Sequence, residues 1–256
     1  MKVPVAKLGL SCVLAIGFSS FSFAQTNAPA VDGSAGQMTV TYLQSLGNYH
    51  SPGVQGFDNR YQGMNGHPYF VDVWLPGKLE VQIGNTQKTQ PFTGLKLKYD
   101  VYSNQLGAII PATKDTLLLS TDVVKSFQME LPGYDQMVEF RKYPQAAALD
   151  PKLANTFFAI LHQGNATLLK GAGKLKIDAN YKGAYSANQP FDQLVDQVHY
   201  FVLNNGQMQK VKLNRKSILN ALVDQEEKLK DYLKKEKLSL NTEQELIKVI
   251  AYYNSL

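Results

Sequence analysis

Cysteine is almost absent from this chain of 256 residues, in which Cys12 is the single example. It lies in the N-terminal segment MKVPVAKLGLSCVLAIGFSSFSFAQT. This segment has two lysines, a short apolar core and small residues before an expected cleavage after Ala24, the pattern of a secretory signal peptide. A mature chain that begins at Gln25 would contain no cysteine. It would therefore have no disulfide, no thiolate nucleophile and no sulfur ligand for a metal.

Long apolar runs are missing as well. The apolar core of the leader, Leu8–Phe18, is shorter than the roughly 20 residues that span a bilayer. No later apolar segment is long enough either, so we expect an exported protein, periplasmic or extracellular, without a transmembrane segment in the mature chain. Lipidation of Cys12 is an alternative. It is disfavoured because most of the apolar core follows this cysteine, whereas a lipoprotein signal has the core before it.

Neither sign of charge dominates. The chain has 26 lysines and arginines against 21 acids, and removing Lys2 and Lys7 with the leader leaves 24 against 21, a net charge of +3. A dedicated nucleic-acid binder carries a larger basic excess, so we expect no nucleic acid as partner. Histidine is scarce too. None of the four histidines has a second histidine or a carboxylate at metal-ligand spacing, and we expect no metal and no other cofactor.

Short alternating runs bounded by turn residues fill most of the mature chain. LKLKYDVY at 95–102 alternates apolar and charged side chains, as a half-buried strand does. Asn-Gly at 205–206 predicts a type I′ hairpin. Pro-Gly at 76–77 predicts a second hairpin, and Gly-Ala-Gly-Lys at 171–174 predicts a turn between strands. Turn signals recur about every 8–12 residues, which favours an antiparallel sandwich or an open barrel.

These patterns divide the chain into four parts. We assign residues 1–24 to the signal peptide, and the small, polar residues 25–37 to a flexible leader. Residues 38–213 form a β-rich domain, whose first nine residues fit a strand or a short helix. Residues 214–256 form a helical subdomain packed on it. The predicted fold class is therefore α+β, mainly antiparallel β followed by two to three short C-terminal helices.

Helix signals are concentrated near the C-terminus. Asn214 is a candidate N-cap, and the pairs Asp224 with Glu227 and Thr242 with Glu245 have the spacing of capping boxes. Each predicted helix has one apolar stripe, which needs a surface to cover. The segment KSILNALVDQEEKLKDYLKKEKLSL mixes lysines with acids and has no single-sign face. It therefore indicates a solvated outer surface and not a phosphate-binding helix.

A glycine-punctuated segment at 47–68 has neither the period of a helix nor that of a strand, and it predicts a long loop of the kind that is often functional. We take Asp58, Arg60, Tyr61 and Trp74 as the candidate ligand-binding residues, because an arginine beside aromatic rings can bind a carboxylate, a phosphate or a sugar. The competing interpretation is structural. In it Asp58 and Arg60 pin the loop to the sheet, while both aromatic rings lie in the core.

Carboxylates offer a catalytic alternative. Asp58 in the loop, with Asp72 and Asp100 in predicted strands, could supply the acid and the base of a hydrolase. Ser34 lacks the strand–turn–helix context of a nucleophile elbow, so no catalytic residue is assigned. We favour a non-catalytic binding or structural module of the periplasm or cell envelope. Its partner would be an unknown envelope protein, a small ligand or a polymer.

Three stretches are distinctive in combination: GFDNRYQGMNGHPYFVDVWLPGKLEV, LKLKYDVYSNQL and LKDYLKKEKLSLNTEQELIKVIAYYNSL. Their Asn-Arg-Tyr, Pro-Tyr, Trp-x-Pro-Gly and Lys-Tyr-Asp-Val-Tyr elements resemble those of a group of exported, uncharacterised proteins common in Bacteroidota-type bacteria. The resemblance covers most of the mature chain. It implies an exported protein of the cell envelope and implies no activity.

Overall fold

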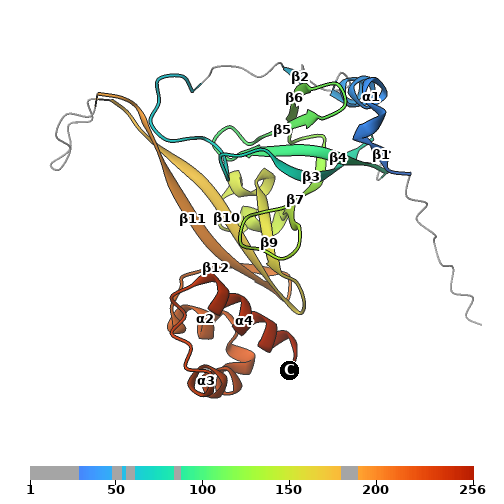
Figure 1. Ribbon diagram of the computed structural model, residues 1–256. Coiled ribbons are helices and arrows are strands. Elements are labelled where there is room, and N and C mark those ends of the chain that lie inside the picture. Colours follow the sequence, from blue (N-terminus) through green and yellow to red (C-terminus); the bar gives the residue numbers. More distant parts are fainter. Residues whose placement is uncertain (1–28, 48–53, 56–60, 84–87, 180–189) are drawn as a thin grey trace, which may run out of the picture.

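The computed structural model describes residues 29–47, 54–55, 61–83, 88–179 and 190–256 (Figure 1). Its strands are β1 (Val31–Asp32), β2 (Val54–Gln55), β3 (Leu75–Gln82), β4 (Thr89–Asp100), β5 (Gln105–Ile110), β6 (Asp115–Ser120), β7 (Val124–Met129), β8 (Val138–Lys142), β9 (Phe157–His162), β10 (Ala166–Ile177), β11 (Gln193–Asn204) and β12 (Gln207–Val211). Its helices are α1 (Gln37–Gly47), α2 (Arg215–Ala221), α3 (Glu226–Lys235) and α4 (Glu243–Asn254), with 3-10 turns η1 (Gly33–Ala35), η2 (Pro144–Ala148), η3 (Pro151–Asn155) and η4 (Val223–Gln225).

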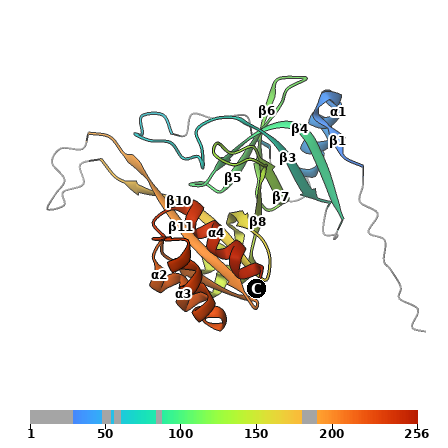
Figure 2. The same ribbon diagram turned by 60° about the horizontal axis from the view of Figure 1, so that its bottom comes forward.

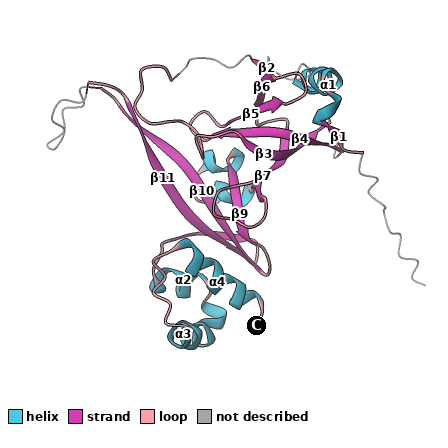
Figure 3. Cartoon of the chain, viewed as in Figure 1, coloured by secondary structure: helices cyan, strands magenta, loops and turns pink. Residues whose placement is uncertain are grey.

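The strands form one continuous open sheet in the order β12-β11-β10-β9-β8-β7-β3-β4-β5-β6-β2, with β1 added in parallel to β4. The other strand pairs are antiparallel. Figure 3 shows α2, α3 and α4 at one end of the β10–β11 ribbon and α1 at the opposite end of the molecule. The predicted α+β class is confirmed, and one open sheet takes the place of the two packed sheets of a sandwich.

The sheet is strongly curled where β3 to β7 meet. Strands β3 to β6 follow one another, but β7 returns to pair with the far side of β3. Residues 121–123 alone join β6 to β7, and such a link spans at most about 15 Å. A flat sheet would separate these two strands by four spacings, or about 19 Å. The curl that brings them together surrounds the main hydrophobic core.

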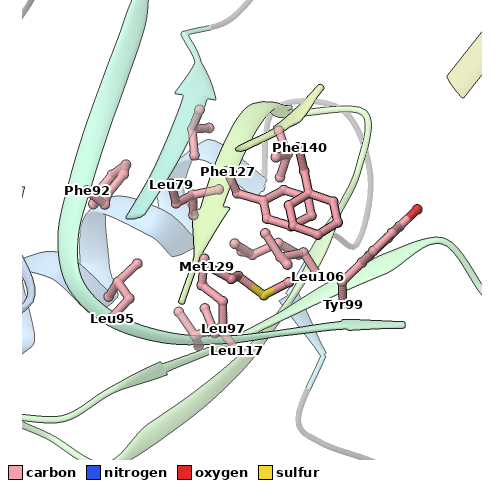
Figure 4. Close-up of a cluster of buried hydrophobic side chains, with 14 of the residues drawn as sticks. Leu79, Phe92, Leu95, Leu97, Tyr99, Leu106, Leu117, Phe127, Met129 and Phe140 are labelled. Atoms are coloured by element: carbon pink, nitrogen blue, oxygen red, sulfur yellow. The ribbon is translucent and has the colours of Figure 1, made fainter. Parts of the chain in front are cut away.

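This core is aromatic at its centre, as Figure 4 shows. The rings of Phe127 and Phe140 stack with centroids 4.6 Å apart, and Tyr99 packs edge-on against Phe127 at 5.4 Å. The alternation predicted for residues 95–102 is confirmed for its buried face, because Leu95, Leu97 and Tyr99 are each at most 2 % exposed.

The C-terminal helices share a second core with one face of β10 to β12. Figure 2 shows α2, α3 and α4 lying against this end of the ribbon. Leu229, Leu233, Leu246 and Ile250 are all buried in this cluster. None of the helices in the described ranges is long and apolar enough to cross a membrane.

Two of the three predicted helix caps are confirmed. The side chain of Asn214 accepts a hydrogen bond from the Ser217 amide, and Thr242 with Glu245 forms a complete capping box. The box predicted at Asp224 is wrong, because residues 223–225 form the 3-10 turn η4 and α3 begins after them. The carboxylate of Asp224 instead accepts a hydrogen bond from the Tyr253 hydroxyl at 2.8 Å.

Two predicted turns are wrong because glycine has another use at these positions. Strand β3 runs straight through Pro76 and Gly77, and its register shifts just after them, as at a β-bulge. Strand β10 likewise continues through Gly171, opposite His199. A Cβ atom at Gly171 would lie 3.0 Å from the Phe201 ring, so this glycine permits a close approach of side chains.

The flexible leader predicted over 25–37 is wrong for residues 31–37, and residues 25–28 lie outside the described part of the chain. Val31 pairs with Phe92 of β4, and the side chain of Asp32 accepts a hydrogen bond from the Ser34 amide at the start of η1. The segment after it is the helix α1, so the helical alternative for residues 38–46 is confirmed. The type I′ hairpin is confirmed by positive φ values at Asn205 (49°) and Gly206 (75°).

Replacing Gly77 by alanine should lower the free energy of unfolding by about 1–3 kcal/mol, because the added methyl group overpacks the sheet. It would lie 2.6 Å from the Gln128 carbonyl oxygen and 2.7 Å from the Leu97 side chain. Gly173→Ala is the matched control, since no atom lies within 4 Å of the added carbon there. Urea unfolding of both variants measures the difference, and equal stabilities would contradict the proposed crowding.

Candidate functional site

A cleft of about 380 Å³ opens between the β10–β11 ribbon and the segment that precedes β3. Its polar lining comes from the segment 67–72, from Tyr134 in the β7–β8 connection, and from Lys170, Lys174 and Asp196 on the ribbon. Its apolar lining includes Phe70, Val71, Val101, Leu131, Pro132 and Val198. A concave site with apolar walls and a few converging polar groups is the usual form of a ligand pocket.

Main-chain hydrogen bonds fix the segment 61–74 between the two halves of the sheet. The Phe70 amide donates to the Tyr99 carbonyl at 2.8 Å, which ties the segment to the end of β4. At its other end Asn65 donates to the Asp192 carbonyl at 2.8 Å and accepts from the Leu194 amide at 2.9 Å. The segment therefore bridges β4 and β11, and it forms one wall of the cleft.

Carboxylates pair with the lysines at the cleft. Lys174, whose side chain is 2 % exposed, donates to Asp196 across the ribbon. The Lys174 nitrogen also lies 3.5 Å from Nδ1 of His67. Lys98 pairs with Asp72 at 2.7 Å, next to the wall of the cleft. The polar groups are therefore largely neutralised, and they leave the cleft without a strong net charge.

Lys170 connects the cleft to the C-terminal helices. Its ammonium group pairs at 2.8 Å with Glu243, the first residue of α4. The same carboxylate accepts hydrogen bonds from the hydroxyls of Tyr134 and Tyr200, the latter at 2.7 Å. This Glu243 cluster joins α4, β10, β11 and the β7–β8 connection behind the cleft.

Burial and the neighbouring groups shift the pKa values of the residues in the Glu243 cluster. Burial and the neighbouring carboxylate both raise the pKa of Tyr134 and of Tyr200 well above the ordinary value for tyrosine. Burial alone would also raise the pKa of Glu243. Hydrogen bonds from Lys170, Tyr134 and Tyr200 together outweigh it, so this pKa is lowered and the carboxylate stays ionised at neutral pH.

Of the four residues predicted to bind a ligand, the two that the structure describes, Tyr61 and Trp74, do not line the cleft. Asp58 and Arg60 lie outside the described residues. The hydroxyl of Tyr61 donates to the carboxylate of Asp100 at 2.6 Å. Trp74 covers Gly107 of β5, where a Cβ atom would lie 2.8 Å from the indole. The competing structural interpretation placed both rings in the core. Both are instead only half-buried, and their contacts hold the segment to the sheet.

Two of the three carboxylates of the hydrolase hypothesis, Asp72 and Asp100, hold structure, and the third, Asp58, lies outside the described residues. Asp100 is 2 % exposed, and besides Tyr61 it accepts hydrogen bonds from the amides of Tyr102 at 3.0 Å and Ser103 at 2.8 Å. Asp72 lies in the segment before β3 and not in a strand, and its partner is Lys98. Asp72 lines the cleft but Asp100 does not, so these two carboxylates do not share it.

The most prominent polar residues of the cleft were missed from the sequence. Lys170 and Lys174 lie on one face of β10, because residues an even number apart share a face of a strand. The turn predicted at 171–174 separates these two lysines, so the sequence does not predict that they share a face of one strand. The pairing of Lys174 with Asp196 depends on the strand register, and that of Lys170 with Glu243 depends on where α4 packs.

Within the described part of the chain, no group of three or more histidine, cysteine, aspartate or glutamate side chains could hold a metal ion. The chain matches no family model, and searches of curated proteins and of solved structures found no significant match.

Proposed function

We propose that the protein is an exported, non-catalytic binding module of the cell envelope, and that its ligand occupies the cleft between the β10–β11 ribbon and the segment 61–74. The cleft itself carries this proposal, because it combines apolar walls with polar groups held in place by ion pairs. The leader sequence, with its expected cleavage after Ala24, supports export.

Two features favour binding over catalysis. The carboxylates Asp72, Asp196 and Glu243 are each paired with a lysine, and hydrogen bonds from Lys170, Tyr134 and Tyr200 lower the pKa of Glu243. A general acid in a hydrolase needs a raised carboxyl pKa, which a lysine partner opposes. The walls are also built on strands and on a segment held by main-chain bonds, which gives the rigid, preformed site expected of a binder.

Filling the cleft tests this proposal. Ala172 lines the cleft opposite Val198, and Ala172→Trp should place an indole in the space that the ligand needs. Gln197→Trp is the matched control, because Gln197 lines a separate pocket on the opposite face of the ribbon. The probes are a panel of muropeptides, oligosaccharides, short peptides and anionic headgroups, each added to the full mature chain in a thermal unfolding assay.

We expect at least one class of probe to raise the Tm of the wild type and of Gln197→Trp but not of Ala172→Trp. At a concentration of about 100 times Kd the rise should be about 5–10 °C. A probe that stabilises Ala172→Trp as much as the wild type would show that the cleft is not its site. A panel without any stabilising probe would also contradict the proposal.

A further inference from the structure

No strand of the described part of the chain pairs with the first half of β11 on the side away from β10, where it forms a sheet edge beside the cleft. β12 pairs only with residues 200–204 of β11, and the register between β10 and β11 runs without a shift from Gln193 to Asn204. In such a ladder alternate residues direct both N–H and C=O to the same neighbour. Asn204 closes the two-residue hairpin with Gln207, so the even-numbered residues of β11 point outward, away from β10.

Both ends of this edge are occupied. At one end Asn65 bonds to the Asp192 carbonyl and the Leu194 amide, which agrees with the outward direction of even-numbered residues. At the other end Tyr200 pairs with Val211, after which the chain turns away toward α2. Between these ends, Asp196 and Val198 direct their N–H and C=O groups outward, and no described residue provides a backbone partner for them.

The uncovered groups lie next to the cleft. The side chains of Asp196 and Val198 both line it, and Val198 is 46 % exposed. Soluble proteins commonly guard a free edge with charged side chains. On β11 the one charge, Asp196, is directed across the ribbon to Lys174. Lys176 lies on β10, which forms the opposite edge of the ribbon, and its side chain pairs with Asp178 and Asp192.

We propose that an extended peptide segment of a partner protein adds to β11 as a further strand between Asn65 and Val211, with one of its side chains in the cleft. This inference rests on the proposed binding function and names its ligand class. The outward N–H and C=O groups of Asp196 and Val198 have the spacing of a strand, and the backbone of an extended peptide can pair with all of them. The walls of the cleft favour an apolar side chain at the position that enters it.

The size of the gap favours a single peptide segment over the sheet edge of a second copy. From Leu194 to Tyr200 the edge spans six residues, or about 20 Å. The bridging segment at Asn65 and the chain that leaves β12 at Val211 bound this length on the same edge. A segment of about five residues fits between these two boundaries. A full strand of a second copy, with its flanking loops, would clash with both of them.

Proline substitutions test the edge without breaking the ribbon. Because the Val198 amide points away from β10, Val198→Pro removes an outward donor and keeps the β10–β11 hydrogen bonds. Asp196→Pro removes the other outward donor together with the carboxylate that pairs with Lys174, so Asp196→Asn is measured beside it to separate the two losses. Lys176→Pro is the matched control, since the even-numbered residues of β10 point outward on the opposite edge, as the bonds between Ala166 and Asn254 show.

The probe is a displayed library of random 12-residue peptides, selected on the full mature chain. Selected peptides are then synthesised, and their Kd is measured on each variant, with the Tm of each variant recorded to confirm folding. We expect the Kd to rise at least about tenfold for Val198→Pro and Asp196→Pro and to stay unchanged for Lys176→Pro. Methylation of alternate amide nitrogens of the peptide should weaken binding to the wild type in the same way.

Equal Kd values for the wild type and a folded Val198→Pro would overturn strand addition, as would a selection that enriches no peptide over the Val198→Pro background. A non-peptide probe that is lost in Ala172→Trp but kept in Val198→Pro would overturn strand addition and leave the binding function standing. Peptides that no longer bind Val198→Pro but bind Ala172→Trp with the wild-type Kd would support strand addition. They would contradict the claim that the ligand occupies the cleft.

Discussion

Replacing Leu233 by alanine should lower the free energy of unfolding by about 2–5 kcal/mol. Leu233 is 1 % exposed and lies in the core shared by α2 to α4 and the face of β10 to β12. The truncation removes buried apolar surface and leaves a cavity, and both effects favour the unfolded chain. Helices as short as α3 depend on such packing, because isolated helices of about ten residues are marginal in water.

The lysines that follow Leu233 provide the control. Lys234 and Lys235 are exposed in the last turn of α3. Their replacement by glutamine should change the stability by about 0.5 kcal/mol or less. Urea denaturation with an unchanged m-value measures both effects. A harmless Leu233→Ala, together with a lysine replacement that abolishes partner binding, would mean that the helices are an interaction arm and do not cover the sheet.

Replacing Glu243 by glutamine should cost about 2–4 kcal/mol, between the loss of one charge-assisted hydrogen bond and that of a fully buried ion pair. The side chain is 12 % exposed and is the common partner of Lys170, Tyr134 and Tyr200. Without its charge, the Lys170 ammonium is left half-buried and uncompensated. Glu227→Gln is the control, because Glu227 is 86 % exposed and its pair with Lys230 contributes little.

The loss of stability caused by Glu243→Gln should become smaller at acidic pH. The pKa of Glu243 is lower in the folded chain than its ordinary value of 4.5. The ionised carboxylate therefore contributes its full stability above pH 4.5, and this contribution is lost as the pH falls through the lowered pKa. The gap in unfolding free energy between the wild type and Glu243→Gln should be constant near neutral pH and shrink below about 4.5. A gap that widens on acidification would contradict the claim that the ionised Glu243 carboxylate stabilises the folded chain.

Local patterns in the sequence predicted those elements whose cause is local. The Asn205-Gly206 turn, the Thr242 capping box and the alternation of β4 each depend on a few neighbouring residues, and all three are present. The local sequence also predicts turns at Gly77 and Gly171, where the strands in fact continue. The role of these glycines depends on Leu97, Phe158 and Phe201 on other strands, which a local pattern does not contain.

The candidate site was less predictable for the same reason. Lys174 pairs with Asp196 because the strand register places the two residues opposite each other. Lys170 pairs with Glu243, which lies 73 positions further along the chain. A search for motifs favours residues close in sequence, and it selected Tyr61 and Trp74, which hold the segment beside the cleft to the sheet. The cleft itself follows from the packing of the ribbon against that segment.

Amide hydrogen exchange along β11 tests the proposed binding edge most directly. In the unliganded mature chain, the amides of Val195, Gln197 and His199 face β10 and should exchange slowly, whereas those of Asp196 and Val198 should exchange fast. The tightest ligand recovered from the panel or the library should slow exchange at Asp196 and Val198. Slow exchange at both without ligand, or ligand protection confined to other strands while β11 stays unchanged, would contradict a binding site at this edge.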